Sequence, residues 1–198
     1  YIPTERLVVR DFTMNDLDAI HHILDVDLKM DDLSRDARAD WLRWSILTYQ
    51  ETARLYQPPH GERAVALRDT DELIGAVGLV LITSPYGILP YYQEQAGGHV
   101  ERRSVAEIGL YWSIASAHQR KGYATEAARA LIDFAFRDMK LRRIIATTEQ
   151  DNHASQAVMR KLGMRLETNP YPEPFWIQVV GILENPDLSP SWPAAPGE

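Results

Sequence analysis

The chain has 198 residues and carries 28 acidic against 21 basic side chains, so its formal charge of −7 does not favour attraction to nucleic acid or anionic membranes. It contains no cysteine, which excludes disulfide bonds and cysteine nucleophiles. Because it also lacks a long uninterrupted apolar run and the layout of a signal peptide at its start, we expect one soluble, cytoplasmic α/β domain.

Apolar periodicity in the first 82 residues predicts strands interleaved with two helices. Runs of apolar and β-branched residues favour strands, whereas apolar residues that recur every three or four positions favour helices with one buried face. Thr13 or Asn15 can cap the first helix, and Pro58 ends the second because proline cannot continue a helix. The predicted elements are strands over residues 7–12, 64–68 and 73–82 and helices over about 15–24 and 34–56.

Residues 83–104 show neither helical nor strand periodicity and are rich in proline, glycine, tyrosine and glutamine. They predict a loop of about 20 residues between the third and fourth strands, which is longer than most connections in compact domains. Such a loop either lines a functional site or is a surface excursion. If it is functional, its aromatic and imidazole side chains could line an acceptor site, namely Tyr86, Tyr91, Tyr92 and His99.

The second half of the chain predicts four further strands and two further helices, which makes about seven strands and four helices in all. Alanine-rich periodicity favours a helix that packs closely on a sheet, and Gly163 is a natural stop for the last helix. Residues 185–198 are expected to form an extended tail. The predicted elements are strands over 105–114, 143–148, 164–168 and 176–183 and helices over 122–139 and 152–162.

The most informative segment is the turn over residues 119–124, between an apolar strand and a helix. Gly122 allows the backbone to approach an anion, and the amide groups in the first turn of the following helix point toward such an anion. Arg120 and Lys121 add positive charge at the same place. The alternative is an ordinary surface loop with two solvated cations.

With its flanking elements, this turn resembles the coenzyme-binding motif of the GNAT superfamily of acetyl-CoA-dependent N-acetyltransferases. Gln119, Gly122 and Ala124 fill the three specified positions of that motif, with alanine in place of its second glycine. A second match is the Asn-x-x-Ser segment over 152–155, whose helix ends in Lys-Leu-Gly-Met over 161–164, and a weaker third match lies at 107–112. The resemblance covers about residues 4–184 and is strongest to the RimJ/RimL-type branch. It implies a single GNAT domain over 1–184.

The resemblance implies a mixed central sheet that is splayed between its fourth and fifth strands, 105–114 and 143–148. In that family the pantetheine arm of acetyl-CoA fills the gap and the pyrophosphate lies against the turn. No metal is expected. The residues implied in binding the cosubstrate are Trp112, Ser113, Ile114, Gln119, Arg120, Lys121, Gly122, Tyr123, Ala124, Thr125 and Asn152.

Transfer of an acetyl group from a thioester to an amine requires a way to remove a proton from the amine and a proton for the departing thiolate. Glu107, at the head of the fourth strand, is the first candidate for the base, and His118 is the second. The resemblance implies Ser155 as the candidate proton donor to the thiolate. The alternatives are a surface carboxylate, a solvated loop histidine and, for Asn152 and Ser155, a purely structural helix cap.

The expected function is acetylation of a primary amine, either a small molecule or a protein N-terminus, by direct attack in a ternary complex. The segment 15–40 holds eight aspartates, which either steer a cationic amine to the site or lie on solvated helix faces. The competing hypothesis is a non-catalytic acyl-CoA-binding or sensor module of the same fold. A homodimer is among the assemblies that the sequence leaves open.

Overall fold

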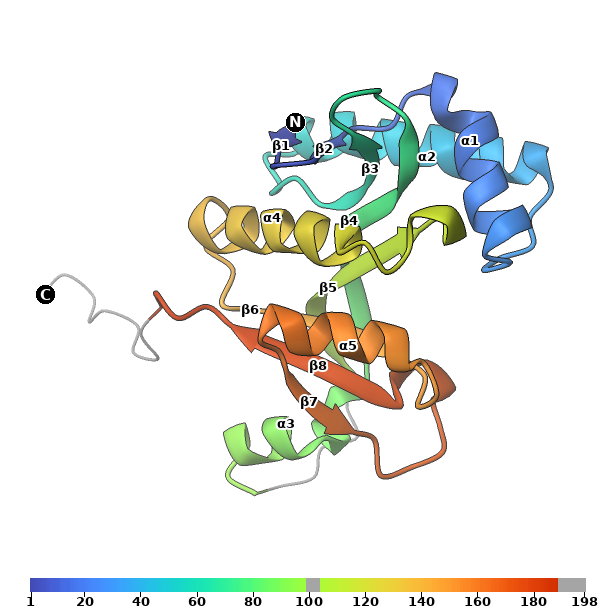
Figure 1. Ribbon diagram of the computed structural model, residues 1–198. Coiled ribbons are helices and arrows are strands. Elements are labelled where there is room, and N and C mark those ends of the chain that lie inside the picture. The colour runs from blue at the N-terminus through green and yellow to red at the C-terminus, as the bar shows by residue number, and fades with distance from the viewer. Residues whose placement is uncertain (99–103, 189–198) are drawn as a thin grey trace, which may run out of the picture.

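The structure is a computed structural model that describes residues 1–98 and 104–188. Its centre is one eight-stranded mixed sheet with the strand order β1-β2-β3-β4-β5-β6-β8-β7 (Figure 1). Each neighbouring pair is antiparallel except β5 and β6, which run parallel. The strands are β1 (Ile2–Pro3), β2 (Leu7–Arg10), β3 (Gly61–Leu67), β4 (Leu73–Ser84), β5 (Val105–Ile114), β6 (Arg143–Thr148), β7 (Arg165–Thr168) and β8 (Val179–Glu184).

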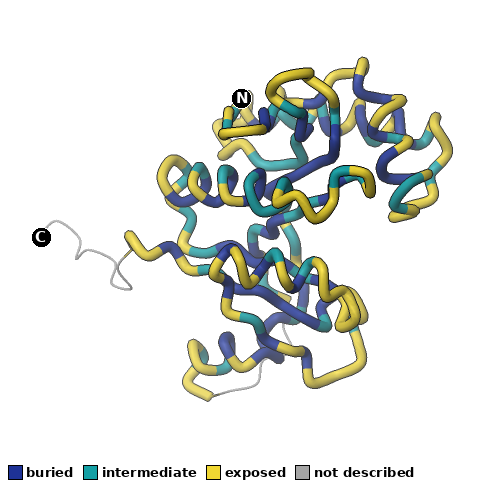
Figure 2. The backbone as a smooth tube through the Cα atoms, viewed as in Figure 1, coloured by how far each residue is buried: buried dark blue, intermediate teal, exposed yellow. Residues whose placement is uncertain are grey.

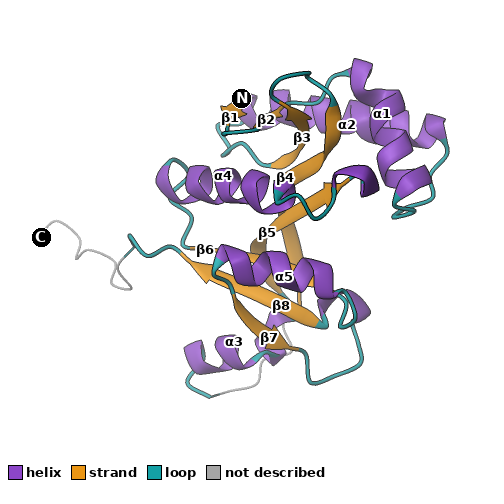
Figure 3. Cartoon of the chain, viewed as in Figure 1, coloured by secondary structure: helices purple, strands orange, loops and turns teal. Residues whose placement is uncertain are grey.

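Helices cover both faces of this sheet (Figure 3). The longest, α2, begins after Ser34, whose hydroxyl accepts a hydrogen bond from the Ala37 N–H, and α5 begins after Asn152 in the same way. The α-helices are α1 (Leu17–His21), α2 (Arg35–Arg54), α3 (Pro90–Gln95), α4 (Tyr123–Arg137) and α5 (His153–Leu162). Short helical turns are η1 (Met14–Asp16), the π-helical η2 (His22–Asp27), η3 (Tyr86–Ile88), η4 (Ser116–His118) and η5 (Phe175–Ile177).

The buried side chains form three clusters, one on one face of the sheet and two on the other. Figure 2 shows buried residues along the strands of the sheet and on parts of its helices. The largest cluster joins α4 and α5 to the inner residues of β2 through β6. On the opposite face, α1, η2 and α2 pack over β3 and β4, while η3 and α3 pack over β6 and β8. The middle of β5 therefore lies between two separate packed regions on that face.

Several segments depart from the predicted arrangement. The predicted strand over 176–183 begins within η5, and β8 starts only at Val179. The segment 83–104, predicted as an irregular loop, contains the end of β4 and the helices η3 and α3. The short β1 was not predicted at all and pairs with β2. Residues 99–103 and 189–198, which include His99 and most of the expected tail, lie outside the described residues.

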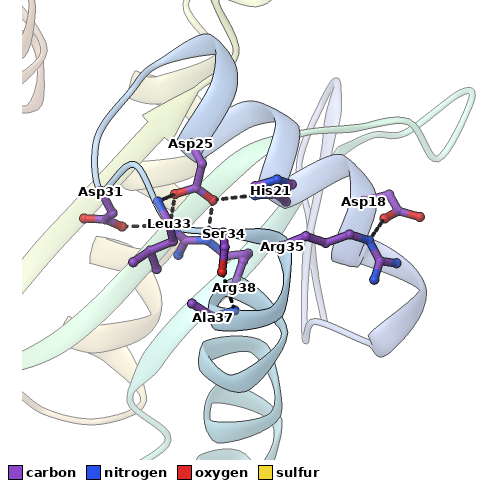
Figure 4. A network of polar contacts seen from close by, with 9 residues as sticks. All are labelled: Asp18, His21, Asp25, Asp31, Leu33, Ser34, Arg35, Ala37 and Arg38. Carbon is purple, nitrogen blue, oxygen red and sulfur yellow. Dashed lines mark hydrogen bonds and ion pairs between the residues drawn. The ribbon is translucent and has the colours of Figure 1, made fainter.

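A buried polar network joins η2 to α2 (Figure 4). The guanidinium of Arg38 donates from Nε and Nη2 to the two carboxylate oxygens of Asp25, each at 2.8 Å, and Nη2 also lies 2.8 Å from Asp31. The Leu33 N–H donates to Asp25 at 3.0 Å, and the Nδ1 atom of His21 lies at the same distance. Burial raises the pKa of Asp25, but these hydrogen bonds outweigh it and lower the pKa to about 2. The network fixes the path of the chain between the two helices.

Candidate functional site

The sheet opens between its two parallel strands. β5 pairs with β4 over its full length, from Val105 with Ser84 to Ile114 with Gly75. It pairs with β6 at one position only, Gly109 with Ile145. Beyond that position the two strands diverge, which confirms the splay expected between the strands at 105–114 and 143–148.

The direction of the backbone groups along β5 can be followed from the residue after it. The Ala115 N–H donates to the Ile74 carbonyl, so at this residue the backbone faces β4. Because the backbone groups of successive residues in a strand point to opposite sides, those of Ser113 also face β4, whereas those of Trp112 and Ile114 face the gap. The Trp112 and Ile114 backbones are therefore the ones presented to the gap. The Ser113 backbone, expected there too, is used within the sheet.

The turn that precedes α4 leaves its amide groups free. Within the described part of the chain, the N–H groups of residues 120–125 donate no hydrogen bond, and no side chain caps the helix at Gly122. Arg120 and Gly122 have positive φ angles, 60° and 88°, on either side of Lys121. Alternation of this kind turns successive N–H groups toward one side and forms a concavity suited to an anion.

Two cations with no ion-pair partner in the described ranges and one paired arginine lie beside this concavity. The side chains of Arg120 and Lys121 are exposed, and neither has an ion pair or hydrogen bond with another described residue. Arg6, which sequence analysis missed, comes from the loop before β2. Its Nη1 donates to the Lys121 carbonyl at 3.0 Å, and its guanidinium lies 4.5 Å from the centre of the Tyr123 ring. No sequence signal links Arg6 to the turn, since more than 110 residues separate them.

Two side chains hold the turn in place. Gln119 donates from Nε2 to the Ile114 carbonyl at 3.0 Å, so its amide braces the turn against the end of β5. Glu126 in the first turn of α4 accepts hydrogen bonds from the Thr4 hydroxyl at 2.6 Å and from the Arg6 N–H at 2.8 Å. Burial raises the pKa of Glu126, and these bonds together with the Arg6 guanidinium lower it below its ordinary value.

The start of α5 lies at the carboxyl end of β6, as the start of α4 follows the carboxyl end of β5. Because the two strands are parallel, both helix starts lie at the end where the strands diverge. Asn152 is exposed and its Oδ1 accepts a hydrogen bond from the Ser155 N–H at 3.0 Å, which is the structural cap considered above. The amide group of Asn152 and the hydroxyl of Ser155 have no further partner among the described residues.

Glu107, the first candidate for the base, is not the surface carboxylate that was its alternative. It is 7% exposed and holds a bidentate ion pair with Arg143, whose Nε lies 2.9 and 3.0 Å from the two carboxylate oxygens, with a further short contact from Nη2. Burial lowers the pKa of Arg143 and the bonds to Glu107 raise it by more, so the guanidinium stays charged. Removing a proton from an amine would require Glu107 to give up this partner.

The remaining predicted residues take other positions. His118 lies 3.4 Å from a Glu72 carboxylate oxygen and its ring centre is 6.2 Å from that of Tyr123, so it is beside the turn. Tyr86, Tyr91 and Tyr92 are buried in the cluster around η3 and α3 and do not line an open site.

Most of the acidic segment is engaged locally. Six of its eight aspartates are bound to an arginine or a backbone amide, which leaves Asp32 and Asp36 without such a partner among the described residues. Little unneutralised charge is therefore left to steer a cationic amine. Within residues 1–98 and 104–188 no three His, Asp or Glu side chains gather as a metal-ligand set, and no helix is both long and apolar enough to cross a bilayer.

Comparison with known proteins places this geometry among acetyltransferases. Residues 6–165 match the model of the acetyltransferase (GNAT) domain. The chain is 30% identical over 171 residues to the uncharacterized N-acetyltransferase YnaD of Bacillus subtilis (strain 168), covering 84% of each chain. Its fold matches an acetyltransferase from Agrobacterium tumefaciens str. C58 with a TM-score of 0.66 and 22% identity, over 92% of this chain and 93% of that one. It also matches RimL, a ribosomal L7/L12 α-N-protein acetyltransferase solved with coenzyme A, with a TM-score of 0.63 and 16% identity over 92% and 97% of the two chains.

Proposed function

Since the chain belongs to the GNAT family of acetyltransferases, we propose that it transfers an acetyl group from acetyl-CoA to a primary amine. Transferase activity follows from the family. The use of acetyl-CoA, the amine acceptor and the direct transfer in a ternary complex are the proposed parts. The similarity to RimL, together with the match of the motifs, supports the RimJ/RimL-type branch.

The observation that carries the proposal is the row of free amide groups over residues 120–125. A diphosphate offers many acceptor oxygens and negative charge, which suit unpaired N–H groups at the start of a helix. The exposed cations Arg120 and Lys121 favour the same ligand, whereas the charge of Arg6 beside them is matched by Glu126. Gly122, at φ 88°, has the conformation that brings the backbone close to such a group.

The gap between β5 and β6 supports a place for the pantetheine arm. Its amide groups could hydrogen-bond with the Trp112 and Ile114 backbones as an added strand would. Asn152 lies at the same end of the gap and retains an amide donor for this arm, and Ser155 retains a hydroxyl for the departing thiolate. In this arrangement the thioester lies near Gly109, where the two strands meet.

In the proposed reaction the amine nitrogen attacks the thioester carbonyl, a C–N bond forms and the C–S bond breaks. The ammonium form of a lysine-like amine has a pKa of about 10.4, so obtaining the neutral amine at pH 7 costs about 4.6 kcal/mol unless a group of the protein accepts the proton. Glu107 forms a bidentate ion pair with Arg143, so we do not assign it as the base that accepts the proton of the amine.

The proposal is tested by incubating the protein with acetyl-CoA and a panel of primary amines while free thiol is measured. The panel should include small polyamines and peptides with free N-termini, because RimL is described as a protein N-terminal acetyltransferase. Amine-dependent thiol release supports the proposal. Binding of coenzyme A in calorimetry without turnover on any amine would instead indicate the non-catalytic module, and preference for ATP over coenzyme A would contradict both.

A further inference from the structure

One carboxylate on the sheet face opposite α4 and α5 has no partner. Glu62 on β3 is half-buried, and its Oε2 atom is enclosed without a hydrogen-bond partner among the described residues. Burying a carboxylate oxygen without a partner is costly, so such an atom calls for an explanation. Glu107 lies on the same face of the sheet, but its charge is matched by Arg143.

The register of the sheet places Glu62 in one row with residues of β4 and β5. Glu62 pairs with Gly78 of β4, and Gly78 pairs with Tyr111 of β5, so the three residues form one row across three strands. A Cβ atom built on Gly78 would lie 3.0 Å from the Glu62 Cγ, which means that the glutamate side chain extends over the glycine. The glycine leaves the space through which the carboxylate approaches Tyr111, and Tyr111 belongs to the strand that borders the gap.

The ionisable groups around Glu62 are either paired with one another or protonated, so Glu62 is the group in this region that can accept a proton. Arg38 and Asp31 face it from α2 and the preceding loop, but they are engaged with each other, and Arg38 also with Asp25. The hydroxyl of Tyr49 donates to the Glu62 backbone carbonyl, and burial raises the pKa of this phenol to about 12. Burial raises the pKa of Tyr111 as well, so both phenols stay protonated near neutral pH.

The loop between η2 and α2 borders Tyr111 at the end of this row. The Tyr111 hydroxyl lies 3.9 Å from the sulfur of Met30, which is 48% exposed. An amine that enters here would pass between Tyr111 and the Glu62 carboxylate before it reaches the thioester. Tyr111 packs against the cluster of α1, η2 and α2, next to the middle of β5 that separates the two packed regions.

We propose that Glu62 binds the acceptor as its ammonium ion and accepts the proton that the amine loses before it attacks. The proton moves from the ammonium nitrogen to the Glu62 carboxylate, and the neutral amine then forms the C–N bond as the C–S bond breaks. One of the two remaining N–H protons ends on the thiolate, the other stays on the amide, and Glu62 returns its proton to solvent. Burial raises the pKa of Glu62 to about 7, although Arg38 lowers it, which suits a base that works near neutral pH.

This inference rests on the proposed acetyl transfer and is tested by the pH dependence of kcat/KM in Glu62→Gln, an isosteric change. In the wild-type protein log kcat/KM should rise with unit slope up to about pH 7 and then level off until the amine itself loses its proton near pH 10. The variant can use only amine that is already neutral in solution, so its log kcat/KM should rise with unit slope from pH 6 to about 10. At pH 7 we expect a loss of kcat/KM of about 100-fold or more that shrinks as the pH increases.

Three controls separate this role from a structural one. Glu51→Gln makes the same change on α2, where the carboxylate side chain is 43% exposed and pairs with Arg54, and it should keep the wild-type profile. Glu62→Gln should keep its affinity for coenzyme A, measured by calorimetry, whereas Glu62→Asp should restore the plateau at a lower level. A Glu62→Gln profile that retains the plateau, in a wild-type protein that is active, would overturn the role of Glu62 alone. No turnover by the wild-type protein would overturn the proposed function itself.

Discussion

The buried pair between Arg38 and Asp25 leads to a stability prediction that can be worked out from the structure. Arg38 is 1% exposed and satisfies two carboxylates, and the Asp25 side chain is 2% exposed. Arg38→Met keeps much of the apolar stem and removes the charge. Asp25 then keeps only the Leu33 N–H and His21 as partners.

Breaking a buried ion pair by removing one partner costs about 3–5 kcal/mol, because the other charge stays buried and unpaired. For a chain of this length each kcal/mol lowers Tm by about 2–4 °C, so the variant should melt about 6–20 °C lower. Arg43→Met is the matched control, since Arg43 lies on the same helix and pairs with Asp40 at the surface. Arg43→Met should lower the free energy of unfolding by about 0–1 kcal/mol.

The assay is urea denaturation followed by circular dichroism, with the slope m compared between variants so that a change in midpoint reports stability. The pH dependence gives a second readout. Because the folded pKa of Asp25 is lowered to about 2 from the ordinary 3.8, the wild-type protein should lose about 2–3 kcal/mol as the pH falls from about 5 to 2. The Arg38→Met variant should lose less over this range. Equal stability of the two arginine variants at pH 7 would refute the reasoning.

Three further outcomes follow from the site. Gly122→Val should weaken coenzyme A binding at least about tenfold in calorimetry, because a φ of 88° is strained for a β-branched residue. The control is Gly163→Val, which has a φ of 84° but lies away from the turn. It should lower the stability of the fold and leave the affinity for coenzyme A unchanged. Arg120→Ala should lower the same affinity and flatten its dependence on salt, and identical salt slopes in the two proteins would contradict a role for this charge. Glu107→Gln should destabilise the fold by about 3–5 kcal/mol in urea because it leaves Arg143 unpaired, and a stable variant that loses only kcat would restore Glu107 as the base.

Apolar periodicity and local signals predicted most of the sheet and the long helices. The bounds of β5 and β6 agree with the predicted ranges 105–114 and 143–148, and Asn152 caps α5, which was one of the alternatives for it. These features depend on residues within one turn or one strand. The helix α3 was missed, since six residues are too few to show a period. Pro90 at its first position was the available signal.

The turn at 119–124 was identified because its glycine, its cations and its flanking elements are contiguous. The ion pair between Glu107 and Arg143 could not be predicted, because it depends on the register of two parallel strands whose residues are 36 positions apart. The same limit applies to the row from Glu62 to Tyr111, which is set by pairing across three strands.

The single backbone pair between β5 and β6 gives the protein an interior strand edge. The unpaired N–H and C=O groups of an edge strand can pair with a further strand, and proteins usually protect such edges. Here the edge runs through the centre of the molecule, with α4 and α5 on one side of it (Figure 1). Hydrogen exchange at Trp112 and Ile114 should therefore be rapid, as in a peripheral strand, while Ser113 between them is slow.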